Sequence, residues 1–275
     1  MSHAKAILFG EHSVIYNKKA IGIPLRNIII NVEITKDKII EDEHVKYIKD
    51  LIKGRYNIKE EIYFRINSDI PMSAGLGSSA ALAIAIAKEV GKKYNIDVDI
   101  FDIVNISEDK AHGKSSGLDL QIIANSKPII FEKNKGIKLF NFNLSKYLVI
   151  ANTGIKGNTK DAVSQVANNI EKNMKYIDEL GNITEDAINS IVENNVYLLG
   201  KLMRKAQENL RKLGLSNDNI EKLINIGRDI SIGEKITGAG LGGCIIFLVE
   251  NLKDAKKLSE KLLDGGAKQT WIEGI

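Results

Sequence analysis

Apolar positions along the chain follow two periods, one typical of strands and one typical of helices. Short runs rich in Ile, Val and Phe, bounded by turn residues, predict strands at 4–9, 14–16, 20–24, 28–35, 63–66, 128–131, 147–151, 244–249 and 267–272. Apolar residues that recur every three or four positions predict helices at 41–54, 78–94, 99–112, 159–176, 184–213, 217–228 and 252–263. This mixture, which contains no internal repeat, predicts an α+β fold.

The pattern changes near residue 150. Before it, short helices and strands alternate, and the strands at 128–131 and 147–151 are expected to complete an N-terminal α+β unit. After residue 158, long helical patterns dominate. Because 275 residues are enough for two moderate domains, we expect domains at residues 1–152 and 153–275.

The stretch 71–82, which reads PMSAGLGSSAAL, combines two glycines with the start of a helix. Gly75 and Gly77 allow backbone angles that a side chain would forbid, and Ser78 and Ser79 open an alanine-rich helix. The N–H groups and the dipole at a helix N-terminus form a natural site for phosphate. The same glycines would also serve a tight turn without a ligand, and the loop alone leaves both interpretations open.

Two other nucleotide-binding loops fit this stretch less well. It contains no Gly-Lys-Ser/Thr, so a Walker A loop is excluded. The spacing Gly-x-Gly-x-x-Ala from Gly75 satisfies the looser dinucleotide fingerprint, with Asp97 about 20 residues further on. However, residues 96–100 alternate with charge instead of forming a buried strand, and Pro71 interrupts the approach to the loop. A phosphate site is therefore favoured over a dinucleotide-binding oxidoreductase.

Composition and charge narrow the classes of function. The net charge of +4 comes from 39 basic and 35 acidic residues spread along the chain, without aromatic residues among the lysine clusters, so we expect no nucleic-acid partner. The single cysteine, Cys244, is expected as a buried small hydrophobe and fits a reducing cytosol. With neither a long apolar segment nor a targeting composition, we expect a cytoplasmic protein with no membrane partner. The sequence leaves a homodimer open.

Two charged residues stand next to apolar runs. Lys5 interrupts the N-terminal apolar strand, so it is either a solvent-facing residue of an edge strand or a functional cation. Asp119 follows the glycine-rich turn 113–117 and precedes an apolar run, where a carboxylate commonly serves as a turn or cap residue. The local sequence leaves both interpretations of each residue open.

Three separated segments together resemble one family. Residues 5–16 (KAILFGEHSVIY), 71–82 and 237–244 (TGAGLGGC) are similar to the three motifs of the galactokinase, homoserine kinase, mevalonate kinase and phosphomevalonate kinase superfamily. The fragment Gly-Glu-His-x-Val-x-Tyr most resembles that of the mevalonate kinases, because galactokinases show Gly-Glu-His-x-Asp-Tyr and homoserine kinases lack the Glu-His pair. The resemblance implies a two-domain small-molecule kinase fold, with a left-handed β-α-β N-terminal domain that binds ATP and a ferredoxin-like C-terminal domain.

The resemblance also implies roles for individual residues. Asp119 matches the catalytic aspartate and Lys5 the lysine that faces it, while Ser79 and Glu108 match the ligands of Mg²⁺. The residues implied to bind the acceptor are Glu11, His12, Thr237 and Gly238. The residues implied to bind ATP are Pro71, Met72, Ser73, Ala74, Gly75, Leu76, Gly77, Ser78, Ser79, Ala80 and Ala81.

These residue types suit phosphoryl transfer, which depends on positioning and charge stabilisation. Asp119 would orient or accept the proton of the attacking hydroxyl, and Lys5 would keep Asp119 ionised. The implied activity is transfer of the γ-phosphoryl group of ATP to the primary hydroxyl of (R)-mevalonate, giving 5-phosphomevalonate in isoprenoid synthesis. A phosphomevalonate kinase and a non-catalytic metabolite sensor on the same fold are the alternatives.

Two positions depart from the family pattern. Asn17 stands where a glycine usually follows Val-x-Tyr, and asparagine tolerates the left-handed region better than most residues. Leu241 stands where glycine is common in the third motif, which bears on the fit of that loop and not on the fold.

Overall fold

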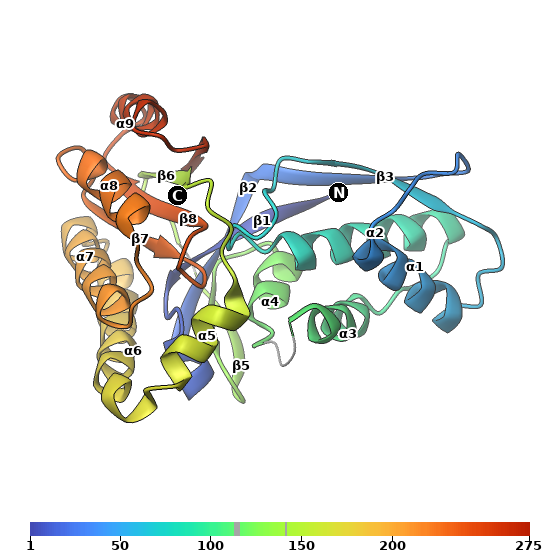
Figure 1. The fold of residues 1–275 in the computed structure, drawn as a ribbon, viewed down its shortest axis with the longest axis horizontal. Coiled ribbons are helices and arrows are strands. Elements are labelled where there is room, and N and C mark those ends of the chain that lie inside the picture. The colour runs from blue at the N-terminus through green and yellow to red at the C-terminus, as the bar shows by residue number, and fades with distance from the viewer. Residues whose placement is uncertain (113–115, 141) are drawn as a thin grey trace.

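Two antiparallel sheets, each covered by helices, form the two lobes of the molecule (Figure 1). The computed structural model describes residues 1–112, 116–140 and 142–275, so residues 113–115 of the glycine-rich turn lie outside it. The strands are β1 (Ser2–Phe9), β2 (Lys19–Thr35), β3 (Tyr63–Ser68), β4 (Ile129–Glu132), β5 (Gly136–Leu139), β6 (Tyr147–Asn152), β7 (Gly233–Thr237), β8 (Cys244–Val249) and β9 (Gln269–Gly274). The helices are η1 (Ser13–Tyr16), α1 (Glu43–Arg55), α2 (Ser78–Tyr94), α3 (Ile100–His112), α4 (Leu118–Asn125), α5 (Thr159–Ala167), α6 (Ile170–Val192), α7 (Val196–Lys212), α8 (Asp218–Gly227) and α9 (Leu252–Asp264).

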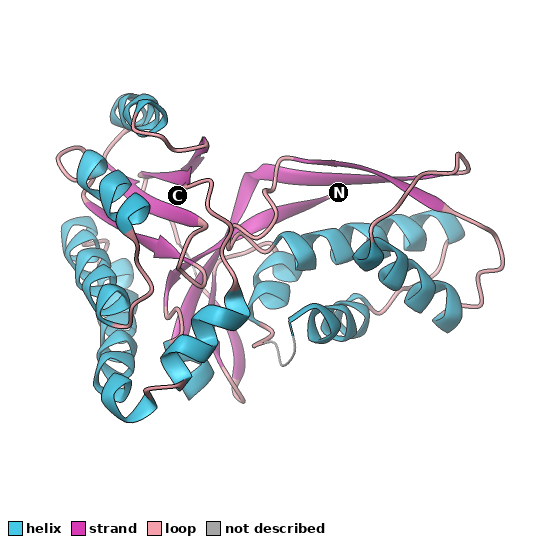
Figure 2. Ribbon diagram, in the orientation of Figure 1, coloured by secondary structure: helices cyan, strands magenta, loops and turns pink. Residues whose placement is uncertain are grey.

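The first sheet has the strand order β1-β2-β4-β5. Strand β3 pairs with the C-terminal part of the long strand β2, whereas β1 pairs with the part of β2 that precedes it. Helices α1, α2 and α3 lie on one side of its long strands (Figure 2). Alanines at 80, 83 and 87 of α2 have no exposed surface, and their small side chains let the helix pack closely on β1 and β2. This packing brings the N-terminus of α2 next to the middle of β1.

The second sheet has the order β7-β8-β6-β9. Along the chain its elements run β6, helices α5 to α8, β7, β8, α9 and β9, which is the β-α-β-β-α-β arrangement of ferredoxin-like units. The expectation that the strand at 147–151 completes the N-terminal unit is wrong, because β6 pairs with β8 and β9. The division of the chain between residues 152 and 153 stays a prediction.

Several local predictions were wrong. Residues 14–16 form the 3-10 helix η1, because the chain must reverse between Phe9 and Lys19 and leaves no room for a strand. The two strands predicted at 20–24 and 28–35 are one continuous strand, β2. The helix predicted at 184–213 is divided between α6 and α7 at Asn194, which has a left-handed φ of 53°. The helix predicted at 159–176 is divided between α5 and α6. The strands β5 and β7 and the helix α4 were not predicted.

Two bulk properties can be compared with the structure. Cys244 has no exposed surface, and burial raises the pKa of its thiol, which confirms that it is a buried small hydrophobe. Among the described residues, no helix is both long and apolar enough to span a bilayer.

Candidate active site

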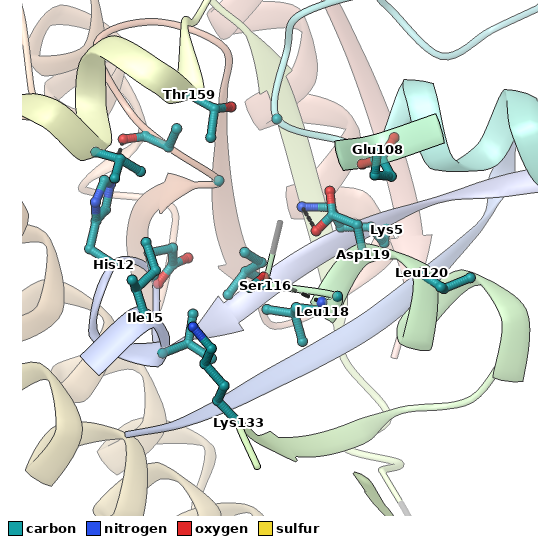
Figure 3. Close-up of a pocket in the computed structure, with 18 of the residues that line it drawn as sticks. Lys5, His12, Ile15, Glu108, Ser116, Leu118, Asp119, Leu120, Lys133 and Thr159 are labelled. Atoms are coloured by element: carbon teal, nitrogen blue, oxygen red, sulfur yellow. Dashed lines mark hydrogen bonds and ion pairs between the residues drawn. The ribbon is translucent and has the colours of Figure 1, made fainter. Parts of the chain in front are cut away.

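A cavity of about 370 Å³ lies where the two lobes meet. Its walls come from β1, the turn after β1, α3, α4, α5 and the loop after β7. The polar and charged side chains that line it are Lys5, Glu11, His12, Glu108, Ser116, Asp119, Lys133, Thr159, Lys160 and Ser164. In Figure 3, Lys5, Glu108 and Asp119 lie at one side of the cavity, while His12, Ile15 and Thr159 lie at the other.

Lys5 and Asp119 form an ion pair with 2.9 Å between Nζ and Oδ1. Strand β1 carries Lys5, whose backbone N–H donates to the carbonyl oxygen of Leu76, and Asp119 stands in the first turn of α4. The side chain of Lys5 is 3% exposed and that of Asp119 is 33% exposed. The structure therefore rejects a solvent-facing Lys5 and leaves the carboxylate within reach of a molecule in the cavity.

The glycine loop 71–82 lies directly against this pair. Gly75 and Gly77 have φ angles of 78° and 75°, in the region that favours glycine. Gly77 also caps the N-terminus of α2. A Cβ atom at Gly77 would lie 2.9 Å from Cγ of Lys5, so any side chain there would displace the lysine. The loop thus needs glycine both for its backbone angles and for the close approach of Lys5.

The second glycine loop, residues 237–243, packs against the first one backbone to backbone. A Cβ atom at Gly238 would lie 2.9 Å from Cα of Gly75, and one at Gly243 would lie 2.8 Å from the carbonyl oxygen of Ala74. Leu241 has a φ of 60°, which a glycine would adopt without strain. Its N–H donates to the carbonyl oxygen of Leu215 at 2.7 Å.

Asn17 ends η1 with a left-handed φ of 60° and ψ of 26°. Asparagine thus adopts the left-handed conformation that its tolerance of that region predicts.

Glu11 and His12, in the turn after β1, are almost fully buried although both line the cavity. Glu11 Oε1 accepts a hydrogen bond from Nζ of Lys235, which lies on β7 and has no exposed surface. Burial raises the pKa of Glu11 and lowers the pKa of Lys235. His12 Nε2 donates to the carbonyl oxygen of Ala239 at 2.7 Å, and burial lowers the pKa of the ring.

Thr237 and Gly238, the other two residues implied to bind the acceptor, have different surroundings from Glu11 and His12. The hydroxyl of Thr237 accepts from the N–H of Ile7 at 2.9 Å and donates to its carbonyl oxygen at 3.0 Å. Its interactions join β7 to β1. Gly238 lines the cavity with its backbone.

Two side chains are the candidates for a magnesium site. Glu108, on α3, is 7% exposed and lines the cavity that contains Asp119. Ser79, in the first turn of α2, has its Oγ 2.9 Å from Nε2 of His44. Among the described residues, no three His, Cys, Asp or Glu side chains gather as a ligand cluster.

Sequence reasoning missed four residues of this region. Lys133, Thr159 and Lys160 line the cavity, but nothing in their local sequence distinguishes them from surface residues. Lys235 carried no comparable signal, because it stands beside Glu234 in a segment where no strand was predicted.

Comparisons with known proteins identify relatives of the chain and of its fold. The chain matches the model of the GHMP kinases N terminal domain at residues 43–126 and that of the GHMP kinases C terminal domain at residues 187–268. It is 30% identical to a mevalonate kinase of Methanocaldococcus jannaschii, over 94% of this chain and 93% of the relative. It is 31% identical to a mevalonate kinase of Pyrococcus furiosus, over 90% and 88% of the two chains.

A solved structure extends the likeness to three dimensions. The crystal structure of the Methanococcus jannaschii mevalonate kinase superposes with a TM-score of 0.84 at 25% identity, covering 100% of this chain and 97% of that one. The two-domain kinase fold that the sequence predicts is thereby confirmed. From the matched domain models and the relatives that it covers almost end to end, the chain belongs to the mevalonate kinase family of the GHMP kinases.

Proposed function

We propose that the protein is an ATP-dependent mevalonate kinase, which transfers the γ-phosphoryl group of ATP to the primary hydroxyl of (R)-mevalonate. The observation that carries the proposal is the Lys5–Asp119 pair, which lies on the cavity and against the glycine loop at the start of α2. A helix N-terminus with glycine-rich backbone favours bound phosphate. A carboxylate beside it can receive a proton from an attacking hydroxyl.

In this proposal the loop 71–82 binds the triphosphate and Asp119 faces the acceptor. Asp119 orients the primary hydroxyl and takes its proton as the oxygen attacks the γ-phosphorus. The bond from the γ-phosphorus to the β,γ-bridging oxygen breaks, and ADP leaves. Lys5 keeps Asp119 ionised and offsets negative charge that develops on the transferred group, since its side chain passes Gly77 of the loop and its Nζ reaches the carboxylate. Little covalent chemistry is required of the protein, because positioning and charge supply most of the catalysis of phosphoryl transfer.

The rest of the cavity matches the chemistry of mevalonate, which combines a carboxylate, two hydroxyls and a methyl group. Lys133 and Lys160 supply cations for the carboxylate. The apolar side chains that can contact the methyl and methylene groups are Val14, Ile15, Leu118 and Val163. Glu11 and His12 supply hydrogen-bond acceptors for hydroxyls.

Glu108, which lines the cavity, and Ser79, in the first turn of α2, have donor atoms that suit Mg²⁺. A buried carboxylate and a serine hydroxyl are hard oxygen ligands, and Mg²⁺ is commonly held by one or two protein groups together with substrate phosphates and water. Glu108 and Ser79 are the residues that would hold it. When bound, the metal would neutralise charge on the phosphates. The single, buried Cys244 supports a cytoplasmic location.

An acceptor panel tests the proposal. ATP consumption is measured in a coupled assay with mevalonate, phosphomevalonate, homoserine and galactose in turn. We expect turnover with mevalonate only. Turnover with phosphomevalonate would identify the first alternative, a phosphomevalonate kinase. The phosphate that this acceptor carries would need cations in the cavity to bind it. ATP binding without turnover of any acceptor would support the non-catalytic sensor and contradict the proposal.

A further inference from the structure

The end of β7 holds the N-terminal segment of the chain through alternate residues. Lys235 and Thr237 are two positions apart on this strand, so their side chains lie on the same face. The hydroxyl of Thr237 bonds both backbone groups of Ile7, and Nζ of Lys235 donates to Oε1 of Glu11. One strand face of the second sheet therefore fixes both β1 and the turn that follows it.

Lys235 and Glu11 have different positions relative to the cavity. Neither side chain has exposed surface, yet Glu11 is part of the described cavity lining and Lys235 is not. A second hydrogen bond, from Nζ to the carbonyl oxygen of Ile236 at 2.6 Å, holds the lysine against its own strand. Lys235 thus bonds Glu11, a residue of the cavity lining, without lining the cavity itself.

The turn after β1 presents two hydrogen-bond acceptors. Within the described part of the chain, Oε2 of Glu11 and Nδ1 of His12 are buried and have no hydrogen-bond partner. His12 Nε2 must carry a proton, because it bonds the carbonyl oxygen of Ala239. Since burial lowers the pKa of His12, the ring is neutral and Nδ1 is an acceptor. An unpaired buried acceptor is costly, so both atoms favour a ligand that supplies donors.

We propose that Lys235 is a positioning residue for the phosphoryl acceptor: it occupies Oε1 of Glu11 and fixes the carboxylate so that Oε2 can accept a hydrogen bond from a substrate hydroxyl. The proposal rests on the proposed function, since it concerns how the same cavity binds its acceptor. It also connects the lobes, because Lys235 belongs to a strand of the second sheet, whereas Glu11 lies in the turn after β1, a strand of the first sheet.

The test compares Lys235→Met with Lys201→Met, a change of an exposed lysine on α7. In Lys235→Met we expect the KM for mevalonate to rise about tenfold or more, which corresponds to about 1.4 kcal/mol of binding. The KM for ATP stays at the wild-type value. Lys201→Met changes neither constant.

The pH profile supplies a readout that a merely structural role would not move. The charged groups that face Glu11 are Lys235 on β7 and Lys5 on β1, and both lower the pKa of its carboxyl. Removing Lys235 therefore raises the pKa of Glu11. The acid limb of kcat/KM for mevalonate should move to higher pH in Lys235→Met, and it should not move in Lys201→Met.

A double-mutant cycle tests whether Lys235 acts through Glu11 even where Lys235→Met folds poorly. Glu11→Gln with Lys235→Met removes both charges, so no uncompensated charge remains buried. Once Glu11→Gln has removed the carboxylate, Lys235 has nothing to orient, so the double variant and Glu11→Gln should share one KM for mevalonate. Additive effects, or an unchanged KM and acid limb in Lys235→Met, would overturn the inference. Failure of the proposed function is distinguishable, because the wild-type protein would then not turn over mevalonate.

Discussion

Two lysine–carboxylate pairs stand at one cavity, and they differ in access to solvent. In the Lys5–Asp119 pair the carboxylate is 33% exposed, whereas both side chains of the Lys235–Glu11 pair have no exposed surface. Each pair joins residues more than a hundred positions apart in the sequence. The same two functional groups therefore occur once in an open setting and once in an enclosed one.

The difference indicates what each pair can do. A carboxylate that must receive a proton from a substrate hydroxyl has to be reachable from the cavity, as Asp119 is. A pair with no exposed surface is costly to form and very costly to break, so it holds groups in position. We therefore assign chemistry to the open pair and positioning to the enclosed pair.

The largest expected effect comes from Asp119→Asn, which removes the proposed proton acceptor of the open pair and keeps the shape of the side chain. We expect kcat to fall by about 10²- to 10⁴-fold, while the affinity for ATP, measured by calorimetry, stays unchanged. Circular dichroism controls for the fold. A variant that keeps most of its turnover would show that the carboxylate has been given the wrong role.

The next largest effect is a difference between the two pairs in how much each lysine contributes to the free energy of unfolding. Lys235→Met leaves a buried carboxylate without its cation and is expected to lower the free energy of unfolding by about 3–5 kcal/mol. Lys5→Met should cost about 1 kcal/mol, because water can reach Asp119. Urea denaturation of the two variants measures both values. Equal losses would mean that exposure does not distinguish the pairs.

A smaller effect concerns His12, beside the enclosed pair. Because burial lowers its pKa below the ordinary value of about 6.5, the unfolded chain binds a proton more readily than the folded one. The resulting stabilisation is present above that value and is lost as the pH falls through the lowered pKa. Denaturation of the wild type and of His12→Gln at several pH values should show a shallower dependence of the free energy of unfolding on pH in the variant. Identical slopes would mean that His12 is not held neutral.

The smallest expected effect is that of salt. At about 1 M NaCl the Debye length is about 3 Å, so the coupling energy of the open pair should fall by a fraction of about 1 kcal/mol. The coupling energy of the enclosed pair should not change. Double-mutant cycles at low and high salt measure both, and a salt-sensitive enclosed pair would contradict its burial.

Local features of the site could be predicted from the sequence. The glycines at 75 and 77 adopt positive φ and lead into α2, because glycine and an alanine-rich run act on their own neighbours. Asn17 takes the left-handed angle expected of it. Lys5 could be noticed because a lone cation in an apolar strand is unusual, but only the fold pairs it with Asp119.

Features that depend on distant residues could not be predicted. A short apolar strand such as β6 does not specify its partners, and it was assigned to the wrong sheet. The β-branched and aromatic residues at 14–16 favour a strand, but the short reversal between β1 and β2 makes them helical. The contact of Lys235 with Glu11 joins residues 224 positions apart, so no local pattern predicts it.

The most direct test of the central claim is to identify the product. ATP, Mg²⁺, the wild-type protein and (R)-mevalonate are incubated together and followed by phosphorus NMR. We predict one new phosphate monoester, coupled to the methylene protons of C5, in equal amount to the ADP formed. Release of inorganic phosphate without that ester, or an ester on another oxygen, would contradict the assignment of the cavity and of its open lysine–aspartate pair.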